Sequence, residues 1–318
     1  MTEVGEYWDR GAIAFAAMAF GLCATLPILA GAAQLPPADL PAALYTDQVD
    51  SKYPASGRGV QFRSHGSLVN AQLYRPGGEE LHPTIILLHG LPGNEQNLDV
   101  AQVMRRAGWT VIAFHYRGSW GSGGKFTLRG GFDDVHALFD YLSNSTNAAA
   151  WGVDAGRIVL MGHSYGGYVA ARASVEAPGV IGVALLAPWD ISMDARAWKG
   201  LVPARRKAEG LAAFDDVDGR LGSTNAASLL DEVMNYGPAL DLTRLAPSLA
   251  SRRLLLITAT RDSEDDKAAG LLAELQRLGA RELTTTSLDS DHGFNSQRIA
   301  LEVQVLRWLA TLPGAPAT

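Results

Sequence analysis

A serine on a sharp turn between a strand and a helix constrains this chain more than any other feature. Ile158–Met161 is a short apolar run, as expected of a strand that is buried on both faces. The sequence Gly162-His163-Ser164-Tyr165-Gly166 interrupts this run, and a helical pattern follows it. The two glycines allow a tight bend, which would hold the Ser164 hydroxyl out at the edge of a sheet. The alternative is a glycine-rich connector in which Ser164 only caps the helix.

The rest of the chain alternates strands with helices. Strand patterns, most of them apolar, occur at Thr84–Leu88, Thr110–Phe114, Arg157–Met161, Val180–Leu186, Leu254–Ala259 and Glu282–Leu288, after an expected hairpin of Val60–Phe62 and Leu68–Tyr74. Helical patterns separate most of these strands, so the sequence predicts an α/β fold with a mainly parallel, doubly wound sheet. In such a sheet, ligands bind at the carboxyl ends of the strands.

One long segment between two strands lacks strand signal. We assign residues 34–318 to a single α/β domain and predict that residues 190–251 are inserted in it as a helical cap. Trp189, Trp198 and Tyr236 have apolar bodies that could line a substrate pocket under this cap. The alternative is an insertion that packs away from the site.

Residues 1–33 have the character of a targeting segment. Gly11–Ala30 carries no charge, and Ala30-Gly31-Ala32 has the small residues of a signal-peptidase site. The flank ahead of it does not fit, because acidic residues outweigh the lone Arg10. We expect export to the periplasm or the medium, with a membrane anchor and a buried cytosolic helix as alternatives. Cys23 is the single cysteine, so the chain can form no internal disulfide.

Composition and spacing argue against several other functions. The net charge of −6 disfavours a nucleic-acid partner, and the basic run Arg205-Arg206-Lys207 is interpreted as a solvated helix face. No histidine lies in a metal-binding spacing, so no metal is predicted. The glycine-rich loop Arg117–Gly124 fits neither dinucleotide nor P-loop spacing, so no phosphate site is predicted.

Three residues suited to nucleophilic catalysis follow predicted strands. Ser164 lies at the turn, Asp262 follows Leu254–Ala259, and His292 follows the last strand. A serine hydroxyl is a weak nucleophile that needs a base, and neutral imidazole is a base near pH 7. A carboxylate on the other ring nitrogen fixes the tautomer and stabilises the imidazolium. We therefore predict a catalytic triad of these three residues, with Asp190 as the alternative acid.

The oxyanion of such a reaction needs two hydrogen-bond donors. We expect them to be the backbone N–H of Tyr165 and that of Leu91, which lies in the loop after Thr84–Leu88. His89 in the same loop is interpreted as holding the loop rather than as a second base. His163 is expected to point away from the reacting atoms and to have a structural role.

With these residues assembled, Gly59–Leu312 resembles an α/β-hydrolase, whose triad has the same order of Ser, Asp and His along the chain. Gly162–Tyr168, Tyr116–Ser119 and Asp291–Phe294 resemble the catalytic domain of the prolyl oligopeptidase family. Dienelactone-hydrolase-like esterases share much of this pattern. The resemblance implies a serine hydrolase of ester or amide bonds that works through an acyl-enzyme and needs no cofactor.

The chain departs from the prolyl oligopeptidase family in two respects. Its 318 residues leave no room for the β-propeller of that family, and His89–Gly93 lacks the tyrosine that the family places in its oxyanion hole. Both departures favour an esterase-like site. Our first hypothesis is hydrolysis of a small carboxylic ester, and the second is hydrolysis of short peptides or amides. The third, from another class, is a catalytically inactive binding protein.

Overall fold

The computed structural model describes residues 40–177, 179–262 and 265–316. The expected export segment, residues 1–33, lies outside them. None of the described helices is long and apolar enough to cross a membrane.

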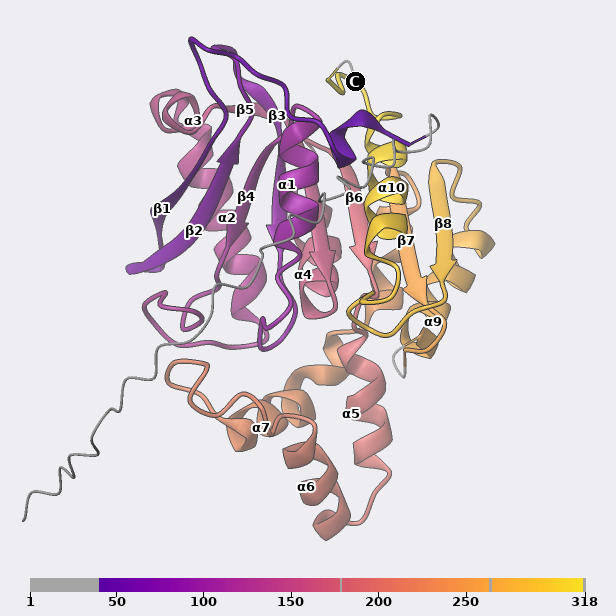
Figure 1. Cartoon of the computed structure of the whole chain (residues 1–318). Helices are drawn as coiled ribbons and strands as arrows, with labels where there is room; N and C mark the ends of the chain where they lie inside the picture. The colour runs from indigo at the N-terminus through magenta and orange to yellow at the C-terminus, as the bar shows by residue number, and fades with distance from the viewer. Residues whose placement is uncertain (1–39, 178, 263–264, 317–318) are drawn as a thin grey trace, which may run out of the picture. The chain divides into compact units, whose positions relative to one another are not determined.

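In the part of the chain that the structure describes, eight strands form one sheet in the order β1-β2-β4-β3-β5-β6-β7-β8. The strands are β1 (Ser56–Ser64), β2 (Ser67–Arg75), β3 (His82–Leu88), β4 (Thr110–Phe114), β5 (Val153–His163), β6 (Val180–Leu186), β7 (Leu254–Ala259) and β8 (Leu283–Leu288). The hairpin β1–β2 and the pair β2–β4 are antiparallel, and all other neighbours are parallel. The predicted mainly parallel sheet is therefore confirmed (Figure 1).

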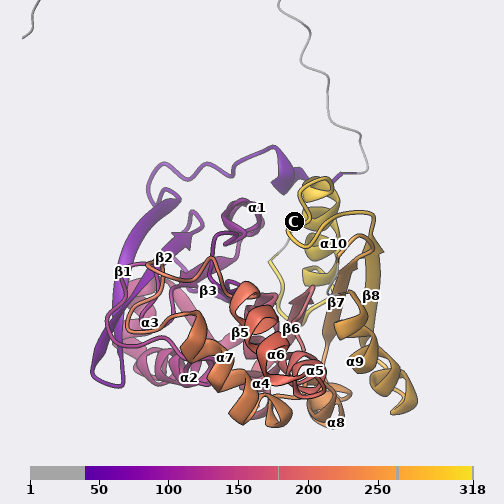
Figure 2. The same cartoon turned by 90° about the horizontal axis from the view of Figure 1, so that it is seen from below.

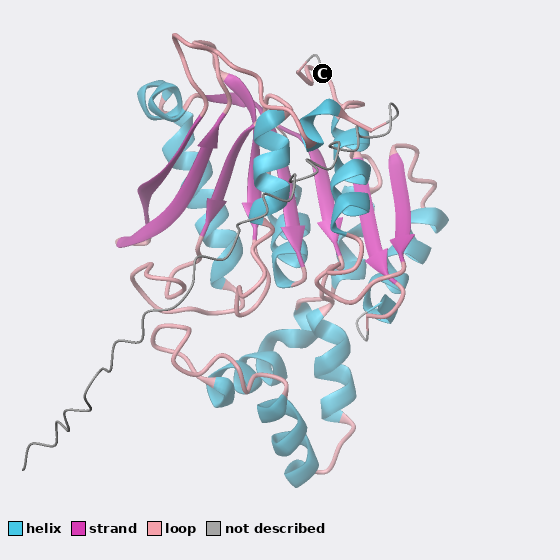
Figure 3. Ribbon diagram, in the orientation of Figure 1, coloured by secondary structure: helices cyan, strands magenta, loops and turns pink. Residues whose placement is uncertain are grey.

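Helices cover both faces of this sheet (Figures 2 and 3). One face carries α1 (Leu98–Arg106) and α10 (Arg298–Leu309), and the other carries α2 (Gly130–Ser143), α3 (Ser145–Trp151), α4 (Tyr165–Val175) and α9 (Asp265–Arg277). Side chains alternate along each central strand, so Ile85 and Leu87 pack with α1 and α10 while Ile86 and Leu88 pack with α2 and α4. The sheet thus has a separate apolar core on each side, as a doubly wound fold requires.

The insertion between β6 and β7 is helical. It contains α5 (Ile191–Lys199), α6 (Pro203–Ala212), α7 (Ala226–Tyr236) and α8 (Ala246–Leu249), with short 3-10 turns at Gly237–Ala239 and Leu242–Leu245. In Figure 1 it lies below the sheet, on the side toward which the strand arrows point. The Glu232 carboxylate of α7 fastens it to the loop before α2, accepting from the N–H groups of Leu128 at 3.0 Å and Arg129 at 3.1 Å. The predicted cap insertion therefore covers the ends of the strands at which ligands bind.

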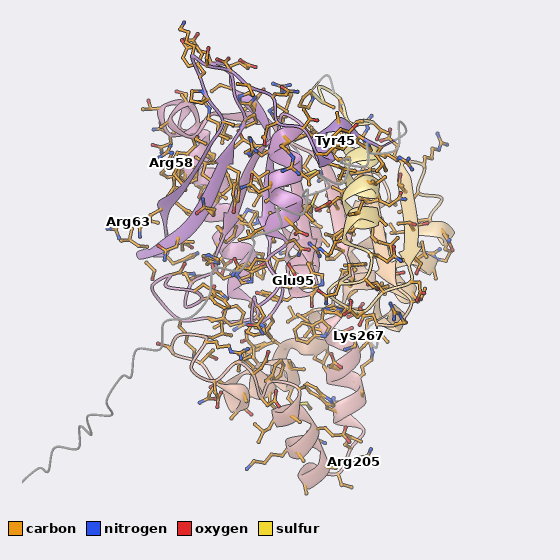
Figure 4. All side chains as sticks on the ribbon, in the orientation of Figure 1. Tyr45, Arg58, Arg63, Glu95, Arg205 and Lys267 are labelled. Atoms are coloured by element: carbon orange, nitrogen blue, oxygen red, sulfur yellow. The ribbon has the colours of Figure 1, made fainter. Side chains whose placement is uncertain are left out.

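The basic run of the sequence lies on α6, at the far end of the cap, where Figure 4 labels Arg205. Arg205 pairs with Glu209 one turn later at 2.6 Å. The Arg206 guanidinium donates to the carbonyls of Trp198, Lys199 and Leu201 at the end of the preceding helix. Arg206 therefore joins α6 to the end of α5, while Arg205 and Lys207 are exposed.

Candidate active site

Ser164 lies on the sharp turn that the sequence predicts between β5 and α4. Its backbone has φ 56° and ψ −121°, a conformation that a residue with a Cβ rarely adopts. The glycines on either side are needed because the backbone is so close-packed. A Cβ on Gly162 would lie 2.0 Å from the Gly166 carbonyl oxygen, and a Cβ on Gly166 would lie 2.1 Å from that of Leu88. The strand and the helix thus meet without side chains between them, and the turn holds Ser164 rigidly.

Two backbone hydrogen bonds fix Ser164 against the next strand. Its N–H donates to the Leu186 carbonyl at 2.9 Å, and its carbonyl accepts from the Trp189 N–H at 3.0 Å. The serine is half-buried, at the carboxyl end of β5 and beside that of β6. This is the edge of the sheet that the cap covers.

His292 and Asp262 form a hydrogen-bonded pair. The His292 Nδ1 lies 2.6 Å from the Asp262 Oδ2, and the Asp262 side chain is only 2% exposed against 36% for His292. An ionised carboxylate only accepts, so Nδ1 carries the proton and Nε2 of a neutral ring is left to accept one. Both residues line the same cavity as Ser164. The three residues of the expected triad therefore lie together.

Asp190, the alternative acid, is engaged elsewhere. It caps the start of α5, where its Oδ1 accepts from the Ser192 N–H at 3.0 Å and from the Ser192 hydroxyl at 2.6 Å. Burial raises the pKa of its carboxyl. Its role in the described contacts is to start the first cap helix.

Three hydrogen bonds to backbone carbonyls hold the loop His89–Gly93, which is expected to supply an oxyanion donor. The Tyr116 hydroxyl donates to the His89 carbonyl at 3.0 Å, and Trp120 Nε1 donates to the Pro92 carbonyl at 2.8 Å. His89 Nδ1 donates to the Gly90 carbonyl at 2.7 Å, and burial lowers the pKa of His89 to about 4, so its ring stays neutral near pH 7. His89 thus braces the loop, and Leu91 lies on the cavity wall.

Tyr165 is the first residue of α4, so its backbone N–H has no acceptor within the helix. Its side chain is fully buried and points away from the cavity, with the hydroxyl donating to the Leu128 carbonyl at 2.9 Å. The side chain therefore fastens the helix, and the N–H remains at the helix N-terminus, where negative charge is favoured.

A cavity of about 350 Å³ opens at Ser164 and His292. Besides the three triad residues it is lined by Leu91, Trp189, Asp194, Trp198, Ala213, Phe214 and Lys267. Two of the three expected pocket residues, Trp189 and Trp198, are among them. Tyr236 is not: its side chain is 42% exposed and its ring lies 3.6 Å from the Arg129 guanidinium carbon. Its position at the end of α7 turns it toward that arginine rather than the cavity, so its assignment to the pocket is corrected.

Comparison with known protein families identifies the fold. A family model described as the alpha/beta hydrolase family matches residues 85–302, which is more than half of the chain. The chain belongs to the alpha/beta hydrolase family.

Solved structures of other hydrolases share the fold. An esterase from Pyrococcus furiosus is 17% identical, with a TM-score of 0.58, over 85% of this chain and 96% of its own. Est1E from Butyrivibrio proteoclasticus, in a structure with ferulic acid bound, is 17% identical with a TM-score of 0.62, over 79% of this chain and 98% of its own. An acylaminoacyl peptidase from Pyrococcus horikoshii is 18% identical with a TM-score of 0.59, over 82% of this chain and 42% of its own. At these identities the likeness is one of fold.

The cavity of this hydrolase also contains residues that sequence reasoning missed. Phe214 packs edge-on against Trp189 and Trp198, with ring centroids 6.3 and 6.0 Å apart. Asp194 on α5 pairs with Lys267 on α9 at 2.8 Å and also accepts from Trp189 Nε1 at 2.6 Å. Figure 4 labels Lys267 where the sheet meets the cap. The ion pair therefore joins the cap to the core at the cavity wall.

No group of three or more His, Cys, Asp or Glu residues that could hold a metal ion occurs in the described ranges of the hydrolase.

Proposed function

We propose that this protein is a serine hydrolase that cleaves a small carboxylic ester through an acyl-enzyme on Ser164. The observation that carries the proposal is the 2.6 Å hydrogen bond between His292 and Asp262, in the same cavity as a serine on a strained strand-to-helix turn. A base with a fixed tautomer and a serine that is accessible from the cavity are what nucleophilic catalysis by serine needs.

In this proposal the Ser164 Oγ attacks the ester carbonyl carbon while His292 Nε2 takes the proton of the Ser164 hydroxyl. The N–H groups of Tyr165 and Leu91 stabilise the oxyanion, while Asp262 stabilises the imidazolium. His292 then gives its proton to the departing alcohol, which leaves the acyl group on Ser164. A water molecule, activated by His292 in the same way, releases the acid.

The loop His89–Gly93 and the cavity walls favour an ester over a peptide. The loop carries no tyrosine hydroxyl, so it offers backbone donors, and the cavity presents Trp189, Trp198 and Phe214 to an apolar acyl or alcohol part. Hydrolysis of short peptides or amides is the second candidate, since an acylaminoacyl peptidase shares the fold. An ester and amide panel separates the two, because a peptidase would turn over the amides as well.

Labelling with a fluorophosphonate tests the proposal against an inactive binding protein. The reagent phosphonylates only an activated serine, so we expect one label per chain, located by mass spectrometry on the peptide that contains Ser164. The His292→Ala variant serves as the control and should take up the label far more slowly. A chain that takes up no label, or takes it up on another serine, contradicts the proposal.

Replacing Trp198 by Leu is expected to shift the preference toward longer acyl chains. The indole forms part of the cavity wall, and leucine keeps an apolar side chain in the cap while opening space. The ratio of kcat/KM for a hexanoate to an acetate ester should rise roughly tenfold, as expected for added methylenes in an apolar pocket. Tyr236→Ala, outside the cavity, is the matched control and should leave the ratio unchanged. Equal ratios in all three proteins would show that the cap does not set chain length.

A further inference from the structure

The residue before the nucleophile makes a direct contact with the base loop, the segment 289–297 that carries His292. His163 is the last residue of β5 and is only 3% exposed. Its Nε2 lies 2.8 Å from the backbone carbonyl oxygen of His292. A carbonyl only accepts, so Nε2 carries the proton and donates it. From the sequence, His163 is expected to point away from the reacting atoms, but its ring lies beside the ring of the expected base and is hydrogen-bonded to the loop of that base.

His163 also touches the other two catalytic parts. It is joined covalently to Ser164, and its ring centroid lies 4.7 Å from that of His292. On its other side is the oxyanion loop: a Cβ on Gly90 would lie 3.4 Å from His163 Nδ1 and 3.1 Å from the Ser164 Cβ. His163 thus lies next to the nucleophile turn, the base loop and the oxyanion loop, and its ring contacts His292.

The His163 ring is neutral, so it can donate from Nε2 without placing a positive charge beside the base. Burial lowers the pKa of His163 to about 3, so the ring is neutral near pH 7. The His163 Nδ1 is buried and has no hydrogen-bond partner. The Nε2–H bond to the His292 carbonyl is therefore the polar contact that offsets the cost of burying this histidine. An apolar side chain would fill the same space without that cost.

The base loop is held at the neighbouring carbonyl as well. Arg298 at the start of α10 donates from Nη1 to the Gly293 carbonyl at 2.9 Å, and its guanidinium is paired with Asp99 on α1. Phe294 is fully buried, with its ring 6.2 Å from that of His163. The carbonyls of His292 and Gly293 thus each accept from a buried or paired side chain. Among the hydrogen bonds of the described residues, the His163 bond is the one that joins this loop to the nucleophile turn.

We propose that His163 is a positioning residue: by donating to the His292 carbonyl it fixes the base relative to Ser164. This inference rests on the proposed function, because it assigns a role within that reaction. A displaced base loop would leave Ser164 and the cavity intact but would lengthen the path of the proton between Ser164 and His292. The loss should therefore fall on kcat and not on KM.

Three variants of His163 test the role. His163→Leu fills much of the space without a donor, His163→Gln places an N–H about as far out as Nε2, and His163→Asn places one only about as far as Nδ1. We expect the Leu variant to lose on the order of 10- to 100-fold in kcat for an activated ester with KM unchanged, as small misplacements of catalytic groups do. The Gln variant should recover most of this loss and the Asn variant should not.

The outcomes separate this inference from the proposed function. A wild-type protein that neither hydrolyses esters nor takes up a fluorophosphonate on Ser164 overturns the proposed function itself. An active wild type whose Leu variant has the same kcat overturns the positioning role alone. If the Leu variant fails to fold, the Gln and Asn variants decide. Equal kcat values for these two folded proteins would show that an N–H at the position of Nε2 is not needed, and would overturn the positioning role.

Discussion

Ser164→Ala and His292→Ala are expected to lower ester turnover by about the same factor, on the order of a million-fold where the triad acts as a unit. The hydroxyl is useless without a base to take its proton, and the base has nothing to activate without the hydroxyl. The double variant should therefore be little worse than either single variant. The measurement is kcat for an activated ester, with the residual rate compared with that in buffer.

The alanine variant of Ser164 is a clean test because it keeps the Cβ. The left-handed backbone at φ 56° is as strained with alanine as with serine, so the fold and its stability should hardly change. Ser145→Ala, at the exposed start of α3, is the matched control and should retain full activity. Undiminished turnover by Ser164→Ala, or strictly additive losses in the double variant, would refute the acyl-enzyme mechanism.

Three of the strands could be predicted to the residue, whereas β5 extends beyond the predicted Arg157–Met161 at both ends, to Val153 and His163. Thr110–Phe114, Val180–Leu186 and Leu254–Ala259 begin and end where their apolar runs do. These strands are almost wholly buried on both faces, so nearly all of their residues are apolar and the run itself marks the element. The doubly wound sheet follows from such runs and the helical patterns between them.

Boundaries set by local backbone conformation were harder to predict. The start of α1 at Leu98 is set by Asn97, which adopts a left-handed conformation with φ 55°. The short helix α3 was not expected, although Asn144 caps it by accepting from the N–H groups of Thr146 and Asn147. A seven-residue helix held by one cap is too short to show a periodic pattern.

The site residues, too, could be predicted only in part from the sequence. Ser164, Asp262 and His292 could be placed because each follows a strand, and parallel strands bring their carboxyl ends to one edge. The cavity wall could not, because it depends on how the cap helices turn. Phe214 and Lys267 face the cavity from elements with no catalytic motif, whereas the aromatic Tyr236 faces Arg129. Side-chain direction on an insertion is set by tertiary packing, which no local pattern records.

Asp262→Asn is expected to keep the fold and lose about ten-thousandfold in kcat, by analogy with the same change in serine proteases. The carboxylate accepts the His292 Nδ1 proton at 2.6 Å, and an amide can instead present an N–H to that nitrogen. His292 would then carry its proton on Nε2 and could not accept one from Ser164. The matching size of the amide should leave the thermal unfolding midpoint close to that of the wild-type protein.

Asp190→Asn is the matched control, because Asp190 also follows a strand and is buried. Its amide oxygen can still accept from Ser192 at the start of α5. The change also removes a buried carboxyl group whose pKa is already raised by burial. Turnover should stay close to that of the wild-type protein, since no contact joins Asp190 to the base in the described structure. The pair of variants thus decides which carboxylate orients His292. A crippled Asp190→Asn beside a nearly normal Asp262→Asn would reverse the assignment, and equal losses in both would mean that neither carboxylate alone fixes the tautomer.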